Sequence, residues 1–511
     1  MPTPTYLFYD LETTGLSRSF DQILQFAAIR VDSDFNEIER FNMRVSLSPD
    51  VIPNPAALLV NRTHPNQFSE GLDEYEAIKK IYEIVNQPGT ISLGYNTLGF
   101  DDEFLRFSFF RHLLPPYRHQ YANDCHRMDI YPMVLLAHHI QPNLLQWPIL
   151  NEKISFKLAN LVQKNELSSG ESHDALVDVL DTIALAKKLK SDGAFWRKAI
   201  GLFNKKNDVD TIQACSRRCQ IDSASYAVGF MMESKPFESL VPVLNLGRGD
   251  PEKNLTQWLR LDTVILCDCP PESLFDQVDV IRKKDGEPPF FFTFDDVSCG
   301  STLSDTNRAA VENNLAFLNK NPSVFTAIRQ HFFNRCYADH FHYDANAALY
   351  KLPFPTSNEE SLFRKFHFID RARKGEVLSA FSQPAHRALA IRLLGRHMPE
   401  ALSSGEKADY EEYKWYVFSA TPDNAMVDHR GEKKLTLTAA LAETEKLLLT
   451  KTTPYEQSML HELKIRYQNS AVSRTRQRDS VAEQGFFGGL PQPNRHDTVS
   501  AVEVNQNEAT L

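Results

Sequence analysis

Two carboxylates near the N-terminus, Asp10 and Glu12, are the first residues in this chain with the spacing for chemistry. They end the apolar run of residues 6–9, and Gly15 marks a turn soon after. Because side chains alternate faces along a strand, both acids project to the same side. Burying two acids without a counter-charge is costly, and a hard divalent cation with oxygen ligands is the simplest counter-charge. For an isolated Asp-x-Glu pair, an edge strand facing water explains the pattern equally well. The metal-site interpretation therefore depends on further ligand residues elsewhere in the chain.

A second candidate acid, Asp101, opens a predicted helix. It follows Asn96 and Phe100 in a loop that leads into an aromatic-rich helix. The helix dipole favours an acid in the first turn, so simple capping is the alternative explanation. Asp102 and Glu103 would cap equally well. The setting of Asp101 directly after Asn96 and Phe100 distinguishes it from its neighbours.

A third cluster, His173 and Asp178, lies at the start of a helix predicted to run to about Lys190. A step of five residues rotates a helix by about 140°, so the two side chains cannot enter one site from a regular helix. We therefore place Asp178 on the helix and His173 on the loop just before it. The alternative is that both are solvated polar residues of the first turns.

Taken together, the three clusters resemble the exonuclease motifs of the DEDD superfamily, in the branch whose third motif carries a histidine. The resemblance covers residues 5 to about 190 and implies a ribonuclease-H-like α/β exonuclease domain over residues 1–190. By this resemblance, the metal ligands are Asp10, Glu12, Asp101 and Asp178. The implied catalytic residues are these four and His173, and the implied substrate-binding residues are Glu12, Thr13, Asn96 and Phe100.

The surrounding pattern predicts the elements that position these residues. Strands over residues 23–31 and 39–45, joined by short polar connections, favour an antiparallel meander with the opening strand. An amphipathic helix over 71–86 and a buried strand over 90–96 complete a mixed sheet flanked by helices. The helix after residue 104 interleaves aromatics with Arg and His, which suits single-stranded nucleic acid. We favour the simpler interpretation of an aromatic core face and a basic solvent face.

Composition sets the broader limits. A chain of 511 residues, 42% hydrophobic and 24% charged, is typical of a soluble globular protein with two to four domains. Without a basic-apolar leader or a bilayer-length apolar run, a cytoplasmic location is expected. The net charge of −10 is mild counter-evidence to a nucleic-acid partner, although metal-holding carboxylates inflate the acidic count. Seven cysteines do not indicate a disulfide framework, and their spacing disfavours a zinc site at Cys215/Cys219 or Cys267/Cys269.

The pattern of the more than 300 residues after residue 190 predicts two further domains and a tail. Residues 195–346 form a mixed domain, β-rich first, with strands expected over 225–232, 240–246, 258–267 and 289–296 and helices over 306–318 and 322–333. Residues 352–468 are helical, with helices expected over 359–373, 384–397, 407–418, 433–449 and 454–467. Residues 470–511 are rich in Ser, Gln, Asn, Gly and Glu, which is typical of a disordered tail.

This layout resembles the exodeoxyribonuclease I family, with local similarity at residues 93–96, 100–103, 155–158 and 343–350. The resemblance extends over about residues 5–467 and implies an SH3-like α+β domain for 195–346 and a helical domain for 352–468. It implies 3′→5′ degradation of single-stranded DNA to 5′-mononucleotides, in DNA repair and recombination. The expected cofactor is Mg²⁺, two ions per site, with Mn²⁺ substituting. Single-stranded-DNA-binding protein is the implied partner, and a monomer without membrane attachment is expected.

The same resemblance implies individual roles. Asp10 would bridge both ions, Glu12 and Asp178 would hold the ion on the water side, and Asp101 would organise the other. His173, with an ordinary pKa of ~6.5, would take a proton from the attacking water. The two added domains are expected to form a basic channel that retains the strand.

Two alternatives remain open on the sequence. An RNA-trimming 3′ exonuclease and a polymerase proofreading subunit share these three motifs, although the long extension argues against the small RNA-trimming enzymes. A catalytically silent single-strand-binding module on the same fold is disfavoured because all five site residues are present.

Overall fold

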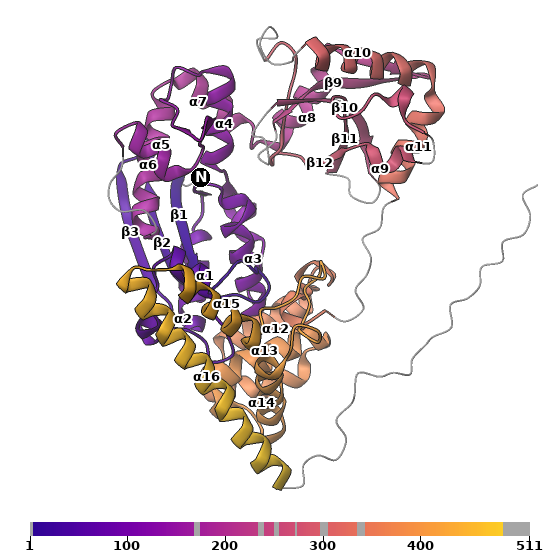
Figure 1. Ribbon diagram of the computed structural model, residues 1–511. Coiled ribbons are helices and arrows are strands. Elements are labelled where there is room, and N and C mark those ends of the chain that lie inside the picture. Colours follow the sequence, from indigo (N-terminus) through magenta and orange to yellow (C-terminus); the bar gives the residue numbers. More distant parts are fainter. Residues whose placement is uncertain are drawn as a thin grey trace, which may run out of the picture.

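The computed structural model describes residues 4–167, 174–232, 240–249, 255–270, 273–296, 305–334 and 343–483. His173 and the tail from residue 484 lie outside the described residues. Figure 1 shows the N-terminal α/β part in indigo to magenta, a β-rich part in rose, and a helical part in orange to yellow. The helical part lies against the lower end of the α/β part.

A five-stranded mixed sheet, in the order β3-β2-β1-β4-β5, is the centre of the α/β part. Strand β1 (Thr5–Thr13) pairs antiparallel with β2 (Ile23–Val31), and β2 pairs antiparallel with β3 (Glu37–Arg44). On its other side β1 runs parallel to β4 (Thr90–Leu93), which runs parallel to β5 (His126–Arg127). The predicted meander and the predicted mixed sheet are confirmed.

Helices cover both faces of this sheet because β1 and β2 bury side chains on both sides. Phe8 and Ala27 belong to one core, whereas Leu7, Tyr9 and Phe26 belong to the other. The helices of the first face are α4 (Ile130–Ile140), α5 (Leu158–Lys164), α6 (Ala175–Lys190) and α7 (Gly193–Gly201). The helices of the second face are α2 (Glu74–Val85) and α3 (Asp101–Arg111). Shorter elements of this part are α1 (Pro55–Val60), β6 (Ile149–Leu150) and β7 (Lys153–Ile154).

The β-rich part is an antiparallel sheet in the order β12-β11-β10-β9-β13, with β8 paired to β9. Its strands are β8 (Arg218–Ile221), β9 (Ala224–Met232), β10 (Leu240–Arg248), β11 (Leu255–Arg260), β12 (Val280–Lys284) and β13 (Phe290–Phe292). Its helices are α8 (Lys205–Ala214), α9 (Leu274–Gln277), α10 (Asp305–Lys320) and α11 (Pro322–Phe333). The strand predicted over 258–267 is wrong in position. Strand β11 ends at Arg260, whose guanidinium binds the Asp262 carboxylate 3.1 Å away in the bend that follows.

The helical part contains the five predicted helices, of which α13 has the predicted ends and the other four have shifted ends. They are α12 (Ser357–Phe368), α13 (Pro384–His397), α14 (Ser404–Ser419), α15 (Leu437–Thr450) and α16 (Pro454–Glu483). The prediction for α12 ran too far, since a 3₁₀ segment replaces the α-helix over residues 371–380. Helix α16 continues to Glu483, so part of the segment expected to be disordered is helical.

Direct contacts join the helical part to the α/β part. The Tyr467 hydroxyl donates to the carbonyl of Pro53 at 2.6 Å, and Arg396 forms a two-pronged ion pair with Asp50 at 2.7–2.9 Å. One apolar core contains Phe107 of α3 together with residues of α12 and α13. In the described part of the chain, no helix combines the length and apolarity needed to cross a bilayer.

Candidate active site

Asp10, Glu12 and Asp178 meet at one face of the sheet. On β1, residues 7, 9 and 11 are buried in the core beneath α2 and α3. Asp10 and Glu12 therefore continue the opposite face, on which Phe8 packs and α6 lies. One carboxylate oxygen from each of Asp10, Glu12 and Asp178 lies within 4.8 Å of the others. The expected same-face arrangement of the two strand acids and the convergence with the third motif are observed.

Asp101 approaches the same strand from the first turn of α3. It is buried, and its Oδ1 accepts a hydrogen bond from the main-chain N–H of Leu11 at 3.1 Å. Leu11 separates Asp10 from Glu12 in β1, so Asp101 is fixed beside both. It is not one of the three acids within 4.8 Å, yet its charge raises the pKa of Asp10.

The electrostatics of this site are those of crowded carboxylates. Burial is the largest cause that raises the pKa of Asp10 well above its ordinary value, and Asp101 and Asp178 add to it. Burial also raises the pKa of Glu12 to about 9, with further contributions from Asp10 and Asp178. Burial likewise raises the pKa of Asp101. A cation held among these oxygens would relieve their repulsion, so the donor set fits hard divalent ions.

Asp174 joins this group, although the sequence analysis assigned no role to it. It is the N-cap of α6 and accepts from the Leu176 N–H at 2.9 Å. Its charge contributes to the raised pKa of both Asp10 and Glu12. The only signal in the sequence was its position before an apolar helix, which predicts a cap and no more. His173, its immediate neighbour, lies outside the described residues.

A buried carboxylate missed by the sequence, Asp129, shapes the loop before Asp101. Its Oδ1 accepts from the Asn96 N–H at 2.8 Å, and its Oδ2 accepts from the Leu98 N–H at 3.0 Å. It also caps α4 by accepting from the Tyr131 N–H at 2.9 Å. Asn96 has a φ of 63°, a left-handed conformation that Asn tolerates better than most residues. Burial raises the pKa of Asp129 to about 7.

The remaining predicted substrate residues line the ends of these same segments. The Thr13 hydroxyl donates to the Gly15 carbonyl at 2.7 Å and holds the turn after β1. Phe100 precedes Asp101, and the Arg18 guanidinium lies 5.2 Å from its ring centre. Arg18 also donates to the Gly99 carbonyl at 3.0 Å, so it links the first and second motifs. No sequence pattern singled out Arg18.

The predicted basic solvent face of α3 is wrong. Arg106 and Arg111 are both buried. Arg106 pairs with Asp102 at 2.9 Å, and Arg111 donates to the main-chain carbonyls of Ser19 and Asp21 at 2.8 Å. Packing on both sides of α3 leaves these charges no access to water, so each requires an internal partner. Asp102, the acid after Asp101, therefore has a structural role, because it pairs with the buried Arg106.

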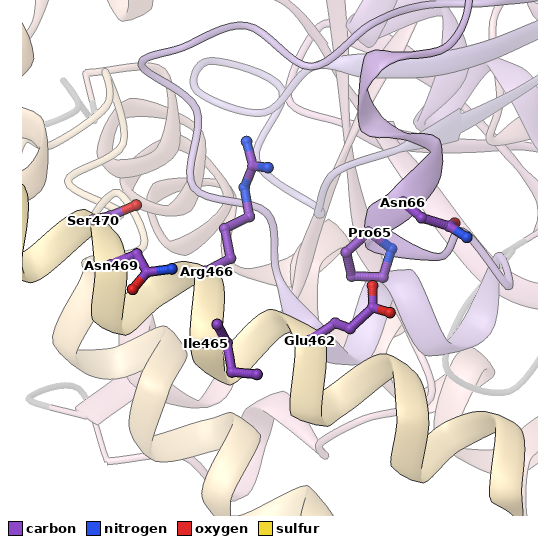
Figure 2. A pocket seen from close by; sticks show the side chains of 7 residues that line it. All are labelled: Pro65, Asn66, Glu462, Ile465, Arg466, Asn469 and Ser470. Carbon is purple, nitrogen blue, oxygen red and sulfur yellow. The ribbon is translucent and has the colours of Figure 1, made fainter.

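A groove elsewhere on the molecule is separate from the carboxylate site. Figure 2 shows it between the segment at residues 65–66 and α16. The groove is lined by Pro65, Asn66, Glu462, Ile465, Arg466, Asn469 and Ser470. None of the predicted site residues lines it. Within the described residues, the clusters with metal-ligand spacing include none of the cysteines.

Comparisons with known proteins agree with this geometry. The exonuclease family model matches residues 7–186. An exodeoxyribonuclease I of Buchnera aphidicola is 36% identical over 207 residues, which cover 40% of this chain and 43% of the relative. The Escherichia coli exodeoxyribonuclease I is 35% identical over 190 residues, which cover 37% of this chain and 40% of the relative. These matches span less than half of each relative's own length.

The fold similarity extends much further along the chain. The structure of Escherichia coli exonuclease I in complex with a dA16 oligonucleotide superposes with a TM-score of 0.78 at 22% identity. It covers 91% of this chain and 100% of that one. The β-rich and helical parts therefore share the exonuclease I fold together with the α/β part. Residues 7–186 are therefore similar to an exonuclease domain, and the chain resembles exodeoxyribonuclease I in its fold and in part of its sequence.

Proposed function

We propose that this chain is a metal-dependent 3′→5′ exonuclease that degrades single-stranded DNA to 5′-mononucleotides. The observation that carries the proposal is the convergence of Asp10, Glu12 and Asp178 within 4.8 Å, inside the domain that matches the exonuclease family. Asp101, tied to the same strand, supplies the fourth carboxylate.

The proposed cofactor is Mg²⁺, two ions per site, with Mn²⁺ as a substitute. Asp10 would contact both ions, Glu12 and Asp178 would hold one of them, and Asp101 would organise the other. Bound there, the ions would supply charge neutralisation at the phosphate and at the attacking and leaving oxygens. The raised pKa values of Asp10, Glu12 and Asp101 support this assignment, because the carboxylates lack compensating charge on their own.

The chain's own residues would orient the substrate and move the proton. His173, placed before α6, is proposed to accept a proton from the attacking water, since a neutral imidazole is basic near pH 7. Glu12, Thr13, Asn96 and Phe100 are proposed to hold the terminal nucleotide. The Asp129 hydrogen bonds to the loop support this role for Asn96, because they fix its main chain next to Asp101.

The added parts of the chain are proposed to keep the strand in place between cuts. Domains over 1–190, 195–346 and 352–468 remain our proposed division, and the fold shared with exonuclease I supports it. We further propose a monomeric, cytoplasmic enzyme of DNA repair and recombination that binds single-stranded-DNA-binding protein. Support for a single-stranded substrate is the oligonucleotide held by the structural relative.

Matched DNA and RNA oligonucleotides, labelled at the 3′ or the 5′ end, test the proposal. With Mg²⁺ we expect immediate release of the 3′ label as mononucleotide, a shortening ladder from the 5′ label, and little cleavage of RNA. Asp10→Ala protein is the matched control for contaminating nucleases. Release beginning at the 5′ end, preference for RNA, or no product with either Mg²⁺ or Mn²⁺ would refute it.

A further inference from the structure

A second group of metal-ligating side chains lies away from the carboxylate site. Glu74, His112 and His397 each offer one ligand atom, and these atoms lie within 4.8 Å of one another. Glu74 is in the first turn of α2, His112 directly follows α3, and His397 ends α13. The group therefore joins the α/β part to the helical part. All three residues are buried, with exposures of 3%, 0% and 8%.

The hydrogen bonds of the two histidines determine which ring nitrogen carries the proton. His112 Nδ1 lies 2.7 Å from the Ser108 carbonyl oxygen, and His397 Nδ1 lies 2.6 Å from Asp73 Oδ2. Carbonyl and carboxylate oxygens only accept, so both Nδ1 atoms donate. In a neutral ring, the lone pair is then on Nε2. Among the described residues, neither Nε2 atom has a hydrogen-bond partner.

Glu74 cannot satisfy these lone pairs, because an ionised carboxylate is also an acceptor. One of its oxygens, Oε2, already accepts from the Ser48 hydroxyl at 2.6 Å. Two imidazole lone pairs and a carboxylate thus converge in a buried site, and among the described residues no hydrogen bond reaches either lone pair. Leaving such groups unsatisfied is costly, and a divalent cation would satisfy all three.

We propose that Glu74, His112 and His397 bind a zinc ion that links the helical part to the α/β part. Two imidazoles and one carboxylate form a known zinc ligand set, in which a water takes the fourth position and ligand distances are about 2.0–2.2 Å. Each proposed ligand has the supporting partner that metal ligands usually have. These partners are the Ser108 carbonyl for His112, Asp73 for His397 and Ser48 for Glu74.

The nearby arginines do not occupy this site. Arg396 is held by Asp50 through contacts of 2.7–2.9 Å. Arg111 donates to the carbonyls of Ser19 and Asp21 at 2.8 Å. The terminal nitrogens of both guanidinium groups are therefore engaged elsewhere, although both charges help to lower the pKa of Glu74 and the Arg111 Nε has no hydrogen-bond partner among the described residues.

Zinc content of the full-length chain tests the proposal. All samples carry Asp10→Asn, so that zinc at the carboxylate site does not contribute. After growth with zinc and gel filtration in metal-free buffer, we expect about one zinc per chain. Adding His397→Gln or Glu74→Gln should reduce zinc affinity by at least about 10–100-fold, the loss typical of removing only a ligand's supporting partner. The matched control is His386→Gln, a buried histidine of the same helix that lies outside the cluster, 3.5 Å from Glu359.

A second measurement keeps the test independent of how well the variants fold. Cobalt added to the zinc-free Asp10→Asn protein should give the intense visible bands of a four-coordinate site, and zinc should displace them. Removing zinc with a chelator should lower the melting temperature of Asp10→Asn protein but not that of the Asp10→Asn/His397→Gln protein. No zinc and no cobalt bands in the Asp10→Asn protein, or equal zinc in all variants, would overturn the proposal. Activity of the carboxylate site enters none of these readouts.

Discussion

The Oδ1 atom of Asp101 accepts a hydrogen bond from the Leu11 main-chain N–H at 3.1 Å. Leu11 is the residue between Asp10 and Glu12, so one bond fixes the second motif against the first. The bond lowers the pKa of Asp101, but burial outweighs it, and the pKa of Asp101 remains raised. The strand and the start of α3 thereby hold three acids in place before any cation binds.

Asp10 is the residue on which the proposed chemistry depends most. Replacing it with alanine should lower cleavage at least about 10²–10³-fold, as expected when one preorganised electrostatic group is removed. The fold should remain intact, since the substitution relieves a crowded carboxylate. Steady-state cleavage of labelled single-stranded DNA and circular dichroism measure the two effects. Asp34→Ala, at an exposed acid of the same domain, should cleave normally. Cleavage by Asp10→Ala at the normal rate would exclude this site.

His173→Ala should separate proton transfer from binding. Loss of a general base typically costs about 10²–10⁴-fold in turnover. Binding of single-stranded DNA and of Mg²⁺ should change little, and the acid limb of the pH–rate profile should disappear. His126→Ala, at an exposed histidine, is the control. Should metal binding fall in parallel with turnover, His173 would be a ligand and not the base.

The raised pKa of Glu12 predicts a pH-dependent stability of the metal-free protein. The pKa is about 9 when folded against an ordinary 4.5, so between these values the folded state holds more protons. Stability should therefore fall as the pH rises through this window. In EDTA, Glu12→Gln should be more stable than the unmodified chain at pH 8, by roughly 1–3 kcal/mol, and nearly equal at pH 4.5.

Urea unfolding at the two pH values, with EDTA or with Mg²⁺, measures this difference. Mg²⁺ should shrink it at pH 8, because a bound cation stabilises the ionised carboxylate. Glu83→Gln, at an exposed glutamate of α2, should show no such pattern. If Glu12→Gln were less stable than the unmodified chain at pH 8 in EDTA, the carboxylates of this site would not repel one another.

Asp129 should act on the reaction through the loop that it holds. Asp129→Ala removes acceptors for the Asn96, Leu98 and Tyr131 N–H groups, and should cost about 1–2 kcal/mol as a lost helix cap. The displaced loop should raise KM and lower kcat/KM by up to about 10²-fold. Asp192→Ala, which removes the N-cap of α7, should cost similar stability and leave KM unchanged. Equal kinetic effects of the two variants would make the role of Asp129 purely structural.

The secondary structure followed the sequence pattern closely where the pattern was local. Strand β2 and helices α11 and α13 have the predicted ends, because a short apolar run, helical periodicity and an N-terminal proline are visible within a few residues. Strand β11 was misplaced, because the apolar residues after Arg260 lie in a bend that Asp262 stabilises. Apolar content alone does not distinguish a strand from a bend whose apolar side chains are buried.

By itself, the sequence determined the order of the acidic motifs and the common face of Asp10 and Glu12, since both depend on spacing along the chain. Only the tertiary structure decided that Asp178 reaches those acids, that the charge of Asp174 acts on them, and that Arg106 is buried. It also decided that Asp129 holds the loop before Asp101. It alone brought Glu74, His112 and His397 together from the ends of three separate helices. Burial and convergence arise from long-range packing, and the free-energy cost of a buried charge depends on partners that are distant in the sequence.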